Sequence, residues 1–289
     1  LAALILRPVA FKYRSKRDGA RWRAGWDWAL FVGGAVPALI FGVAVGNVLL
    51  GVPFYLTEDL MPMYDGSFYG KFLGLLQPFA LLAGAVSLAM LITHGAAWLS
   101  LKAEGPVAAR ARSIGVVSGL VAIAGYAAAG LWLAFGIDGF AMANAVVRDG
   151  PSNPLWSEVT RGGSWLSAYA ERPWIAVAPA MGFAGMALAV LGLRAGREVS
   201  TLLWSKLGIT GVIASVGLTM FPFILPSTVN PDSSLTVWDA SSSHQTLFVM
   251  LVSTAIFMPL ILFYTAWVYK VLWGKVSEAD VTGNADSVY

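Results

Sequence analysis

The chain has 289 residues, of which 57% are hydrophobic and only 12% are charged. An ordinary soluble domain carries about 25% charged residues, so this composition, with a mean hydropathy of +0.70, excludes a typical soluble enzyme and indicates a polytopic membrane protein. The absence of cysteine excludes disulfides, thiol nucleophiles and iron–sulfur ligation within this chain. The net charge of +3 comes from basic residues in the loops, so nucleic acid is not an expected partner.

The first element is a short apolar segment, Leu1–Leu6, followed by a basic stretch from Arg7 to Arg23. Crossing a bilayer needs about 20 apolar residues, so this segment cannot span one by itself. We therefore interpret it as the end of a transmembrane helix whose start, with everything before it, lies upstream of this sequence.

Six longer apolar blocks follow, each long enough to cross a bilayer at a rise of about 1.5 Å per residue. Backbone groups in lipid must pair within their own segment, so these blocks are predicted to be helices. The predicted spans are 27–50, 72–101, 113–137, 174–194, 201–224 and 244–273. The expected fold class is all-α: a polytopic helical membrane bundle with six complete transmembrane helices and the C-terminal end of one more. Residues 1–274 are predicted to form a single transmembrane domain, and residues 275–289 a polar cytoplasmic tail.

Basic residues alternate between the two sides of the predicted bundle. Fourteen Lys and Arg lie on one side, in the loops 11–26, 102–112 and 194–206 and from residue 270 onward. Four lie on the other side, in the loops 51–71, 138–173 and 225–245. The positive-inside rule places the first set and the C-terminus in the cytoplasm. The long outer loop 138–173 is expected to pack as a cap on the bundle or against a partner.

Few ionisable residues lie in or beside the spans, and such residues indicate function. Arg7 precedes Pro8 near the cytoplasmic end of the first segment. It is either an interfacial arginine that reaches the lipid head groups, or a charge that faces the bundle interior and supports a proton path or a subunit contact. Asp27 opens the first complete span. A carboxylate there is favoured by the helix dipole, and the alternative is a role in proton entry.

His94 lies in the cytoplasmic half of the span 72–101. Three roles are open to it: a metal or haem ligand, a proton relay, or a histidine hydrogen-bonded to a neighbouring helix. The other histidine, His244, starts the last span at the outer side, so the two cannot clamp one haem within this chain. A pairing of His94 with one of the nine methionines is a further alternative, although methionine is common in apolar cores.

Three further residues are candidates for structural or interface roles. Asn47, near the outer end of the first complete span, is expected to define a turn, or to present its amide to a quinone ring or a neighbouring subunit. Trp238 and Asp239 lie just before the last span. Asp239 suits a helix N-terminus there, and Ser241 to Ser243 offer N-cap hydroxyls.

The catalytic motifs of soluble enzymes do not occur: there is no Walker A loop, HExxH pair, GxSxG elbow or dinucleotide fingerprint. From the residues alone the chain is compatible with a transporter, a redox subunit or a scaffold. Pro37 and Pro259 fall inside spans and are expected to kink them. They are not flanked by similar sequence, so the repeat signature of many secondary transporters is missing.

Several short stretches, each weak alone, occur in an order and spacing that extends over nearly the whole chain. They are Arg7–Phe11 (RPVAF), Tyr13–Lys16 (YRSK), Trp26–Trp28 (WDW), Phe41–Phe54 (FGVAVGNVLLGVPF), Phe135–Gly139 (FGIDG), Ser152–Leu155 (SNPL), Phe221–Phe223 (FPF), Ser234–Ser242 (SLTVWDASS) and Tyr264–Trp267 (YTAW). In this combination the chain resembles subunit II of the cytochrome bd family of quinol oxidases.

The resemblance implies a fold of nine transmembrane helices, of which this chain would hold the last six and the end of the third. It implies a heterodimer in the bacterial inner membrane with a larger subunit I, which carries the b-type and d-type haems and the quinol site. Such a complex oxidises ubiquinol or menaquinol, reduces O₂ to water and generates proton-motive force. A structural quinone and a small accessory subunit are further candidates for binding.

By this resemblance the chain would support aerobic respiration and electron transport rather than perform the chemistry, and alone it would be inactive. It would stabilise subunit I and line a proton or oxygen route, with no cofactor or metal ion of its own. Arg7 aligns with a family arginine that supports activity, so Arg7 and then Asp27 are the first candidates for activity or a proton path. The alternatives are a secondary transporter and a purely structural membrane subunit.

Overall fold

The computed structural model describes residues 1–289 except 18, 65, 67–69, 71–72, 145–152 and 278–289. Six helices in the described part are long and apolar enough to cross a membrane. They are α2 (Ala20–Leu50), α4 (Pro78–Lys102), α5 (Gly105–Gly136), α7 (Val177–Arg194, preceded by the 3₁₀ turn η3, Pro173–Ala176), α8 (Glu198–Met220) and α9 (His244–Val271). The predicted all-α class with six complete spans is therefore confirmed.

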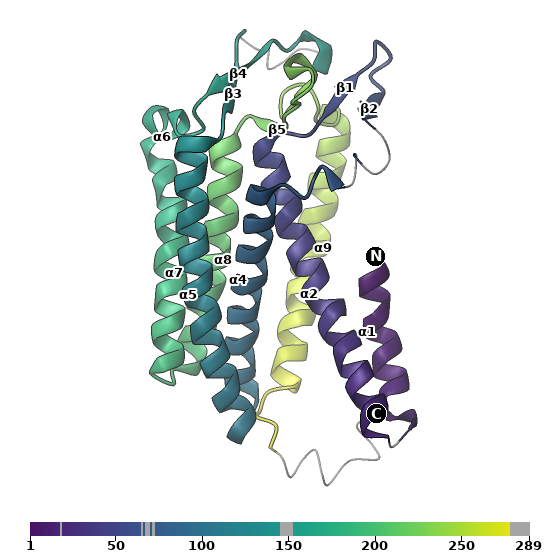
Figure 1. The fold of residues 1–289 in the computed structure, drawn as a ribbon, viewed down its shortest axis with the longest axis vertical. Helices are drawn as coiled ribbons and strands as arrows, with labels where there is room; N and C mark the ends of the chain where they lie inside the picture. Colours follow the sequence, from purple (N-terminus) through teal and green to yellow (C-terminus); the bar gives the residue numbers. More distant parts are fainter. Residues whose placement is uncertain (18, 65, 67–69, 71–72, 145–152, 278–289) are drawn as a thin grey trace.

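The first apolar segment belongs to a longer helix, α1 (Ala2–Tyr13), which continues through Pro8. The 3₁₀ turn η1 (Arg14–Lys16) then leads toward α2. α1 packs against the first half of α2, and the two helices form an antiparallel pair at one side of the molecule (Figure 1).

Several helices begin or end away from the predicted bounds. α2 starts at Ala20 rather than residue 27, and α5 starts at Gly105 rather than residue 113. Hydropathy marks only the part of a helix in lipid, whereas both helices extend beyond it into a basic, polar stretch. α4 starts at Pro78 rather than residue 72, because proline suits the first turn of a helix. α8 ends at Met220 rather than residue 224, since Pro222 follows and cannot continue a helix.

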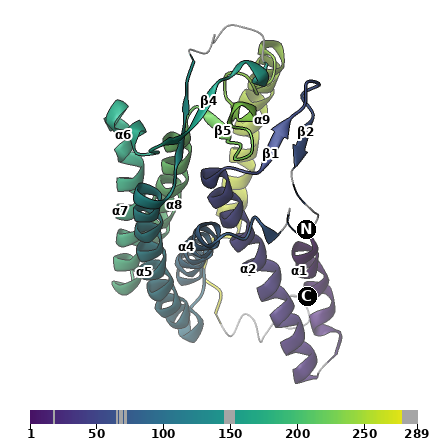
Figure 2. The ribbon, with the colours of Figure 1, turned by 45° about the horizontal axis from the view of Figure 1, so that its top comes forward.

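Four of the long helices, α4, α5, α7 and α8, lie side by side as a bundle, and α2 packs on the outer side of α4 (Figures 1 and 2). Glycines bring α7 and α8 close together. A Cβ atom at Gly211 would lie only 2.7 Å from the Cα of Gly182, and one at Gly185 only 2.6 Å from the Cα of Gly208. Small residues at such crossings let membrane helices gain van der Waals contact, which is their main source of packing energy in lipid.

One end of the bundle carries three two-stranded antiparallel sheets (Figure 1, top). They pair β1 (Phe54–Leu56) with β2 (Pro62–Tyr64), β3 (Gly139–Met142) with β4 (Val159–Gly163), and β5 (Phe223–Leu225) with β6 (Leu235–Thr236). The short elements η2 (Pro154–Trp156), α6 (Ser167–Glu171) and η4 (Pro231–Ser233) lie between and beside them. We call these loops together the outer cap (residues 51–64, 139–144, 153–172 and 221–243).

The outer cap has an apolar core that joins it to the helices. Phe140, Val159 and Trp165 of the long loop are buried against Leu49 at the end of α2 and against Phe223. The Nε1 of Trp165 also donates a 3.1 Å hydrogen bond to the carbonyl oxygen of Leu49. The described part of the loop 138–173 thus packs onto the bundle, as predicted.

Candidate functional site

Arg7 lies on the face of α1 that meets α2. Its aliphatic stem passes over Gly33, where an added Cβ atom would lie 2.7 Å from the Cγ of Arg7. The residue is nevertheless exposed, and no hydrogen bond or ion pair joins its guanidinium to the described part of the chain. The helix ends six residues later, at Tyr13, so the Cα of Arg7 lies about 9 Å from that end along the helix axis. In the described chain the charge is on the surface of the helix pair, not in the bundle interior.

Asp27 does not lie at a helix N-terminus, because α2 begins at Ala20. Its two carboxylate oxygens accept hydrogen bonds from Arg14, at 2.6 Å from Nε and 3.3 Å from Nη2. The prediction of a dipole-stabilised carboxylate at the start of the helix is therefore wrong. Asp27 instead ties η1 to the second turn of α2, and the pair is open to solvent, which weakens it by screening.

His94 joins α4 to α8 through a 2.8 Å hydrogen bond between its Nδ1 and the Oγ of Ser205. The hydroxyl of Ser205 also lies 2.9 Å from the carbonyl oxygen of Leu202, and if it donates there, Nδ1 of His94 is the donor to Ser205. Of the alternatives that the sequence left open, this geometry favours the histidine hydrogen-bonded to a neighbouring helix.

Similar hydroxyl pairs tie the other helices to one another. Thr93 of α4 and Ser118 of α5 lie 2.9 Å apart, and both are buried. The phenol of Tyr126 on α5 lies 2.7 Å from the Oγ of Ser215 on α8. Each hydroxyl in lipid needs a partner, because water is not available to it, so these pairs help to fix the register of neighbouring helices.

Asn47 is buried on α2, with 5% of its surface exposed, and it does not form a turn. Its Nδ2 donates to the carbonyl oxygens of Val43 at 2.9 Å and Leu75 at 2.7 Å. The second bond ties α2 to the segment before α4, so the structure replaces the predicted turn with a clamp between helix and loop. The Oδ1 of Asn47 is buried and has no hydrogen-bond partner.

Asp239 organises the outer cap rather than the start of α9. Its Oδ1 accepts hydrogen bonds from the backbone N of Thr236 at 2.9 Å and from the Thr236 hydroxyl at 2.7 Å, and its Oδ2 accepts one from the hydroxyl of Ser157. Trp238 packs edge-on against Phe221, with ring centroids 5.6 Å apart. The N-cap of α9 is Ser243, whose Oγ accepts from the backbone N of Thr246. The serine prediction is confirmed, and the aspartate prediction is wrong.

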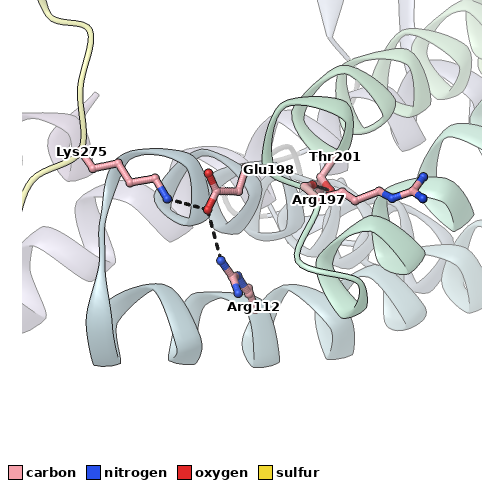
Figure 3. A network of polar contacts seen from close by, with 5 residues as sticks. All are labelled: Arg112, Arg197, Glu198, Thr201 and Lys275. Atoms are coloured by element: carbon pink, nitrogen blue, oxygen red, sulfur yellow. Dashed lines mark hydrogen bonds and ion pairs between the residues drawn. The ribbon is translucent and has the colours of Figure 1, made fainter.

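A polar cluster at the end of the bundle opposite the outer cap was not predicted from the sequence. Figure 3 shows Glu198, the first residue of α8, between Arg112 of α5 and Lys275 beyond α9. Its Oε1 lies 3.3 Å from Arg112 Nη2 and 2.7 Å from Lys275 Nζ. In the same view the hydroxyl of Thr201 donates to the carbonyl oxygen of Arg197. The sequence feature that could have indicated this cluster is a single carboxylate, Glu198, in a loop whose other charged residues are basic.

Lys102 at the end of α4 contacts the segment after α9 that also contains Lys275. Its Nζ donates to the carbonyl oxygen of Leu272 at 2.9 Å and lies over the rings of Trp98, at 5.7 Å, and Trp273, at 5.1 Å. The backbone N of Val276 donates to the carbonyl oxygen of Lys102 at 2.8 Å. We call residues 272–276 with these contacts the C-terminal clasp.

α9 differs from the other long helices because none of its residues is buried. It runs along the bundle from the outer cap to the C-terminal clasp (Figures 1 and 2). Its large apolar side chains are exposed along its whole length, from Leu247 to Val271. Near the C-terminal clasp, the ring of Tyr269 meets that of Trp98, with the ring centroids 5.6 Å apart.

The bundle interior is packed. A cavity between α4, α5, α7 and α8, lined by Met90, Tyr126, Phe183 and Met186 among others, has a volume of about 10 Å³, which holds one water molecule at most. Among the described residues no group of three or more acidic or histidine side chains is placed to hold a metal ion. His94 bonds Ser205, and His244 opens α9 beside the outer cap, so the two histidines do not fit the two ligands of one haem, as predicted from the sequence.

Comparisons with known sequences and with a solved structure cover almost the whole chain. Residues 1–272 match the family described as cytochrome bd terminal oxidase subunit II. Cytochrome bd-I ubiquinol oxidase subunit 2 of Escherichia coli strain K12 is 41% identical over 100% of this chain and 76% of its own length. A probable cytochrome oxidase subunit 2 of Haemophilus influenzae is 40% identical over 100% of this chain and 75% of its own length. The solved structure of bd oxidase from Geobacillus thermodenitrificans shares the fold, with a TM-score of 0.62 and 13% identity over 95% of this chain and 72% of that chain.

The fold and its buried contacts define a multi-pass helical membrane protein with a four-helix bundle and one long helix, α9, that has no buried residue. The matches to sequence and structure are more specific. The chain belongs to the cytochrome bd terminal oxidase subunit II family, so the resemblance predicted from its short motifs is confirmed.

Proposed function

We propose that this chain is the supporting, non-haem subunit of a respiratory quinol:O₂ oxidoreductase of the cytochrome bd type. In such a complex two quinol molecules and one O₂ give two quinones and two water molecules. Protons for the water come from the cytoplasm, so turnover generates proton-motive force. The b-type and d-type haems belong to subunit I, and the Escherichia coli relative, a ubiquinol oxidase subunit, supports quinol as the reductant. Ubiquinol and menaquinol are the candidates.

The observation that carries this proposal is the exposed surface of α9, a helix of 28 residues with none buried. An apolar helix that makes no buried contact within its own chain suits association with another membrane subunit, where van der Waals contact with small and apolar residues drives packing. We infer that α9 and the neighbouring faces of the bundle cover subunit I.

Arg7 and Asp27 have different roles in this proposal. Arg7 is exposed near the cytoplasmic-side end of α1, and we propose that its guanidinium supports activity from the surface of the α1–α2 pair. Asp27 is held by Arg14, so proton entry at Asp27 would have to break this ion pair. The pair supports a structural role for Asp27 and makes Arg7 the stronger candidate.

The proposed location is the bacterial inner membrane, with the C-terminus in the cytoplasm. The basic loops predicted to be cytoplasmic, which join α1 to α2, α4 to α5 and α7 to α8, all lie at the end of the molecule opposite the outer cap (Figure 1). This arrangement supports the positive-inside assignment. Residues 1–274 are proposed to form one transmembrane domain, followed by a polar tail, residues 275–289. Residues 278–289 of this tail lie outside the described part. A bound quinone and a small accessory subunit stay candidates.

The proposal is tested by purifying the complete gene product through a C-terminal tag in mild detergent and recording a reduced-minus-oxidised optical spectrum. Co-purification of a larger subunit with b-type and d-type haem bands, together with quinol-dependent O₂ uptake, is the expected result. The matched control is the tagged chain made without subunit I, which should show no haem bands. A single haem-free chain from the first preparation would contradict the proposal.

The role of Arg7 is tested in the same complex with Arg7→Gln beside the control Arg110→Gln, an exposed arginine of α5. We expect Arg7→Gln to lower quinol-dependent O₂ uptake by about tenfold, the effect of losing roughly 1.4 kcal/mol of stabilisation, while the haem bands stay. Arg110→Gln should leave uptake unchanged. Equal rates in both variants would leave Arg7 without a role in turnover.

A further inference from the structure

The turn between α1 and α2 concentrates positive charge. Residues 12–27 contain six basic side chains and two carboxylates. The resulting net charge of +4 exceeds the +3 of the whole chain. The basic residues are Lys12, Arg14, Lys16, Arg17, Arg21 and Arg23. This turn therefore carries the strongest local field for an anion on the proposed cytoplasmic side.

Aromatic rings give the turn a fixed shape. Tyr13 stacks on Trp26 at 5.9 Å, and Trp22 meets Trp26 edge-on at 5.7 Å. The Nε1 of Trp22 also donates a 2.9 Å hydrogen bond to the carbonyl oxygen of Tyr13. These three rings tie the end of α1 to the start of α2 at the level where tyrosine and tryptophan favour the membrane interface.

Two of the basic side chains lie over these rings in cation–π contacts. Lys16 Nζ lies 4.8 Å from the centroid of the Tyr13 ring, and the guanidinium of Arg17 lies 5.1 Å from that of Trp22. Both residues are exposed, and within the described part of the chain neither pairs with a carboxylate. Their charges are thus positioned in advance, which reduces the entropy lost when an anion binds.

The same turn contains a cleft of about 230 Å³ between α1, η1 and α2, although Lys16 and Arg17 do not line it. It is lined by the polar residues Arg14, Ser15 and Asp27 and by the apolar residues Phe11 and Leu30. A cleft with both kinds of side chain suits the region of a phospholipid where the phosphate and glycerol meet the acyl chains.

Two cations in the other cytoplasmic-side turns have partners within the chain. Arg112 pairs with Glu198, and Lys102 donates to the carbonyl oxygens of Leu272 and Gly274. The turn between α1 and α2 is distinguished by its net charge and by the rings that order Lys16 and Arg17.

We propose that this turn binds the phosphate of an anionic phospholipid, with Lys16 and Arg17 on the phosphate and the acyl chains along Phe11 and Leu30. Basic clusters immediately beside a membrane helix attract anionic lipids, and each Lys or Arg near the surface adds a measurable part of the affinity. The proposal goes beyond the oxidase function, because it concerns the lipid around the complex and needs only the geometry of this turn.

Native mass spectrometry of the intact, delipidated complex tests the proposal. Dioleoyl phosphatidylglycerol is titrated onto the parent complex and onto the double variant Lys16→Gln/Arg17→Gln. The matched control is Arg194→Gln/Arg197→Gln, which removes the same charge from the exposed turn between α7 and α8. We expect the first double variant to bind the lipid about 30-fold more weakly and the control to bind it as the parent does. Dioleoyl phosphatidylcholine, which has no net charge, should not distinguish the variants.

Three outcomes would overturn the proposal: equal lipid affinity in all complexes, equal loss in both double variants, or displacement of the lipid by millimolar inorganic phosphate. The last result would assign the site to a free anion instead. An optical spectrum of the same samples keeps the two proposals separate, because a complex without haem would contradict the oxidase function while its lipid titration could still be compared between variants.

Discussion

At the scale of single residues, buried polar side chains carry the connections between distant parts of the chain. Asp239 receives hydrogen bonds from Thr236, its near neighbour, and from Ser157 in the long loop. Only 6% of its surface is exposed. An acceptor buried this way stabilises the outer cap, because its loss would leave several donors without water or any other partner.

Replacing Asp239 by alanine should therefore destabilise the complex. The backbone N and hydroxyl of Thr236 and the hydroxyl of Ser157 would lose their acceptor, at an expected loss of about 3 kcal/mol. Scanning fluorimetry of the purified complex should show a lower unfolding midpoint for Asp239→Ala. Asp59→Ala, at an exposed position of the same cap, is the control and should leave the midpoint unchanged. Equal midpoints in both variants would refute the role of Asp239 as a clamp.

His94 allows a test that separates a structural hydrogen bond from a haem ligand. We expect His94→Leu to keep the full haem absorption of the complex, since the ring already bonds Ser205 at 2.8 Å. Its effect on stability should be small, because side-chain hydrogen bonds between membrane helices average about 0.6 kcal/mol. A double-mutant cycle with Ser205→Ala measures the coupling of the pair. Loss of a haem band in His94→Leu would show that the ligand alternative is correct.

At the scale of helices, close crossings depend on a few glycines. The α7–α8 crossing brings Gly211 against Gly182 so closely that a methyl group at Gly211 would overlap the neighbouring backbone. Elsewhere on the same helix the surroundings are open: a Cβ atom at Gly217 would meet nothing within 4 Å. α8 therefore carries both a constrained glycine and a free one.

The two alanine variants Gly211→Ala and Gly217→Ala should behave in opposite ways. At Gly211 the methyl group would push α7 and α8 apart and lower the unfolding midpoint of the complex, whereas at Gly217 alanine would improve helix propensity by up to about 1 kcal/mol. Both changes add one methyl group to α8, so each is the control for the other. The close crossing would be contradicted if Gly211→Ala were as stable as Gly217→Ala.

Hydropathy predicted the helices themselves, but not the ends of several. The extension of α2 from residue 27 back to Ala20 includes Arg21 and Arg23, which hydropathy assigns to a loop. This error also misplaced Asp27: a carboxylate thought to open a helix lies in its second turn and pairs with Arg14. Contacts between a turn and a helix depend on the path of the turn, which no spacing rule specifies.

Residue type predicted some roles in the candidate site and left others hidden. Ser243 was found because N-cap geometry is local. The contacts of His94 with Ser205 and of Asn47 with Leu75 join segments far apart in the sequence, so only the packed bundle could reveal them. Glu198 showed a weak signal, as a single carboxylate among basic residues, but its partner Lys275 lies in a segment expected to be a polar tail.

At the scale of the whole molecule, α9 is tethered mainly through the segments at its two ends. The outer cap precedes it, and the C-terminal clasp follows it, where Lys102 and Glu198 hold residues 272–276 against the ends of α4 and α8. Ala103 and Val276 form an isolated backbone bridge within this clasp, so their Cα atoms lie at a spacing that a disulfide can join.

The chain has no cysteine, so an engineered pair can report on the clasp without background. Ala103→Cys with Val276→Cys should form a disulfide under mild oxidation, detected by a mobility change that a reductant reverses. Adding Lys102→Met should lower the yield, since the carbonyl oxygens of Leu272 and Gly274 lose their donor. Each single cysteine variant is the control. No cross-link in the double cysteine variant would mean that this segment lies elsewhere.

The bare surface of α9 has a consequence for how the complex is made. α4, α5, α7 and α8 precede α9 in the chain, so they leave the ribosome and can close into a bundle before α9 is synthesised. No residue of α9 is buried, and the other four helices pack mainly on one another. We therefore predict an order of biogenesis, in which the bundle forms first and α9 then meets the proposed partner. In a copy without its partner, we expect α9 to be open to membrane proteases.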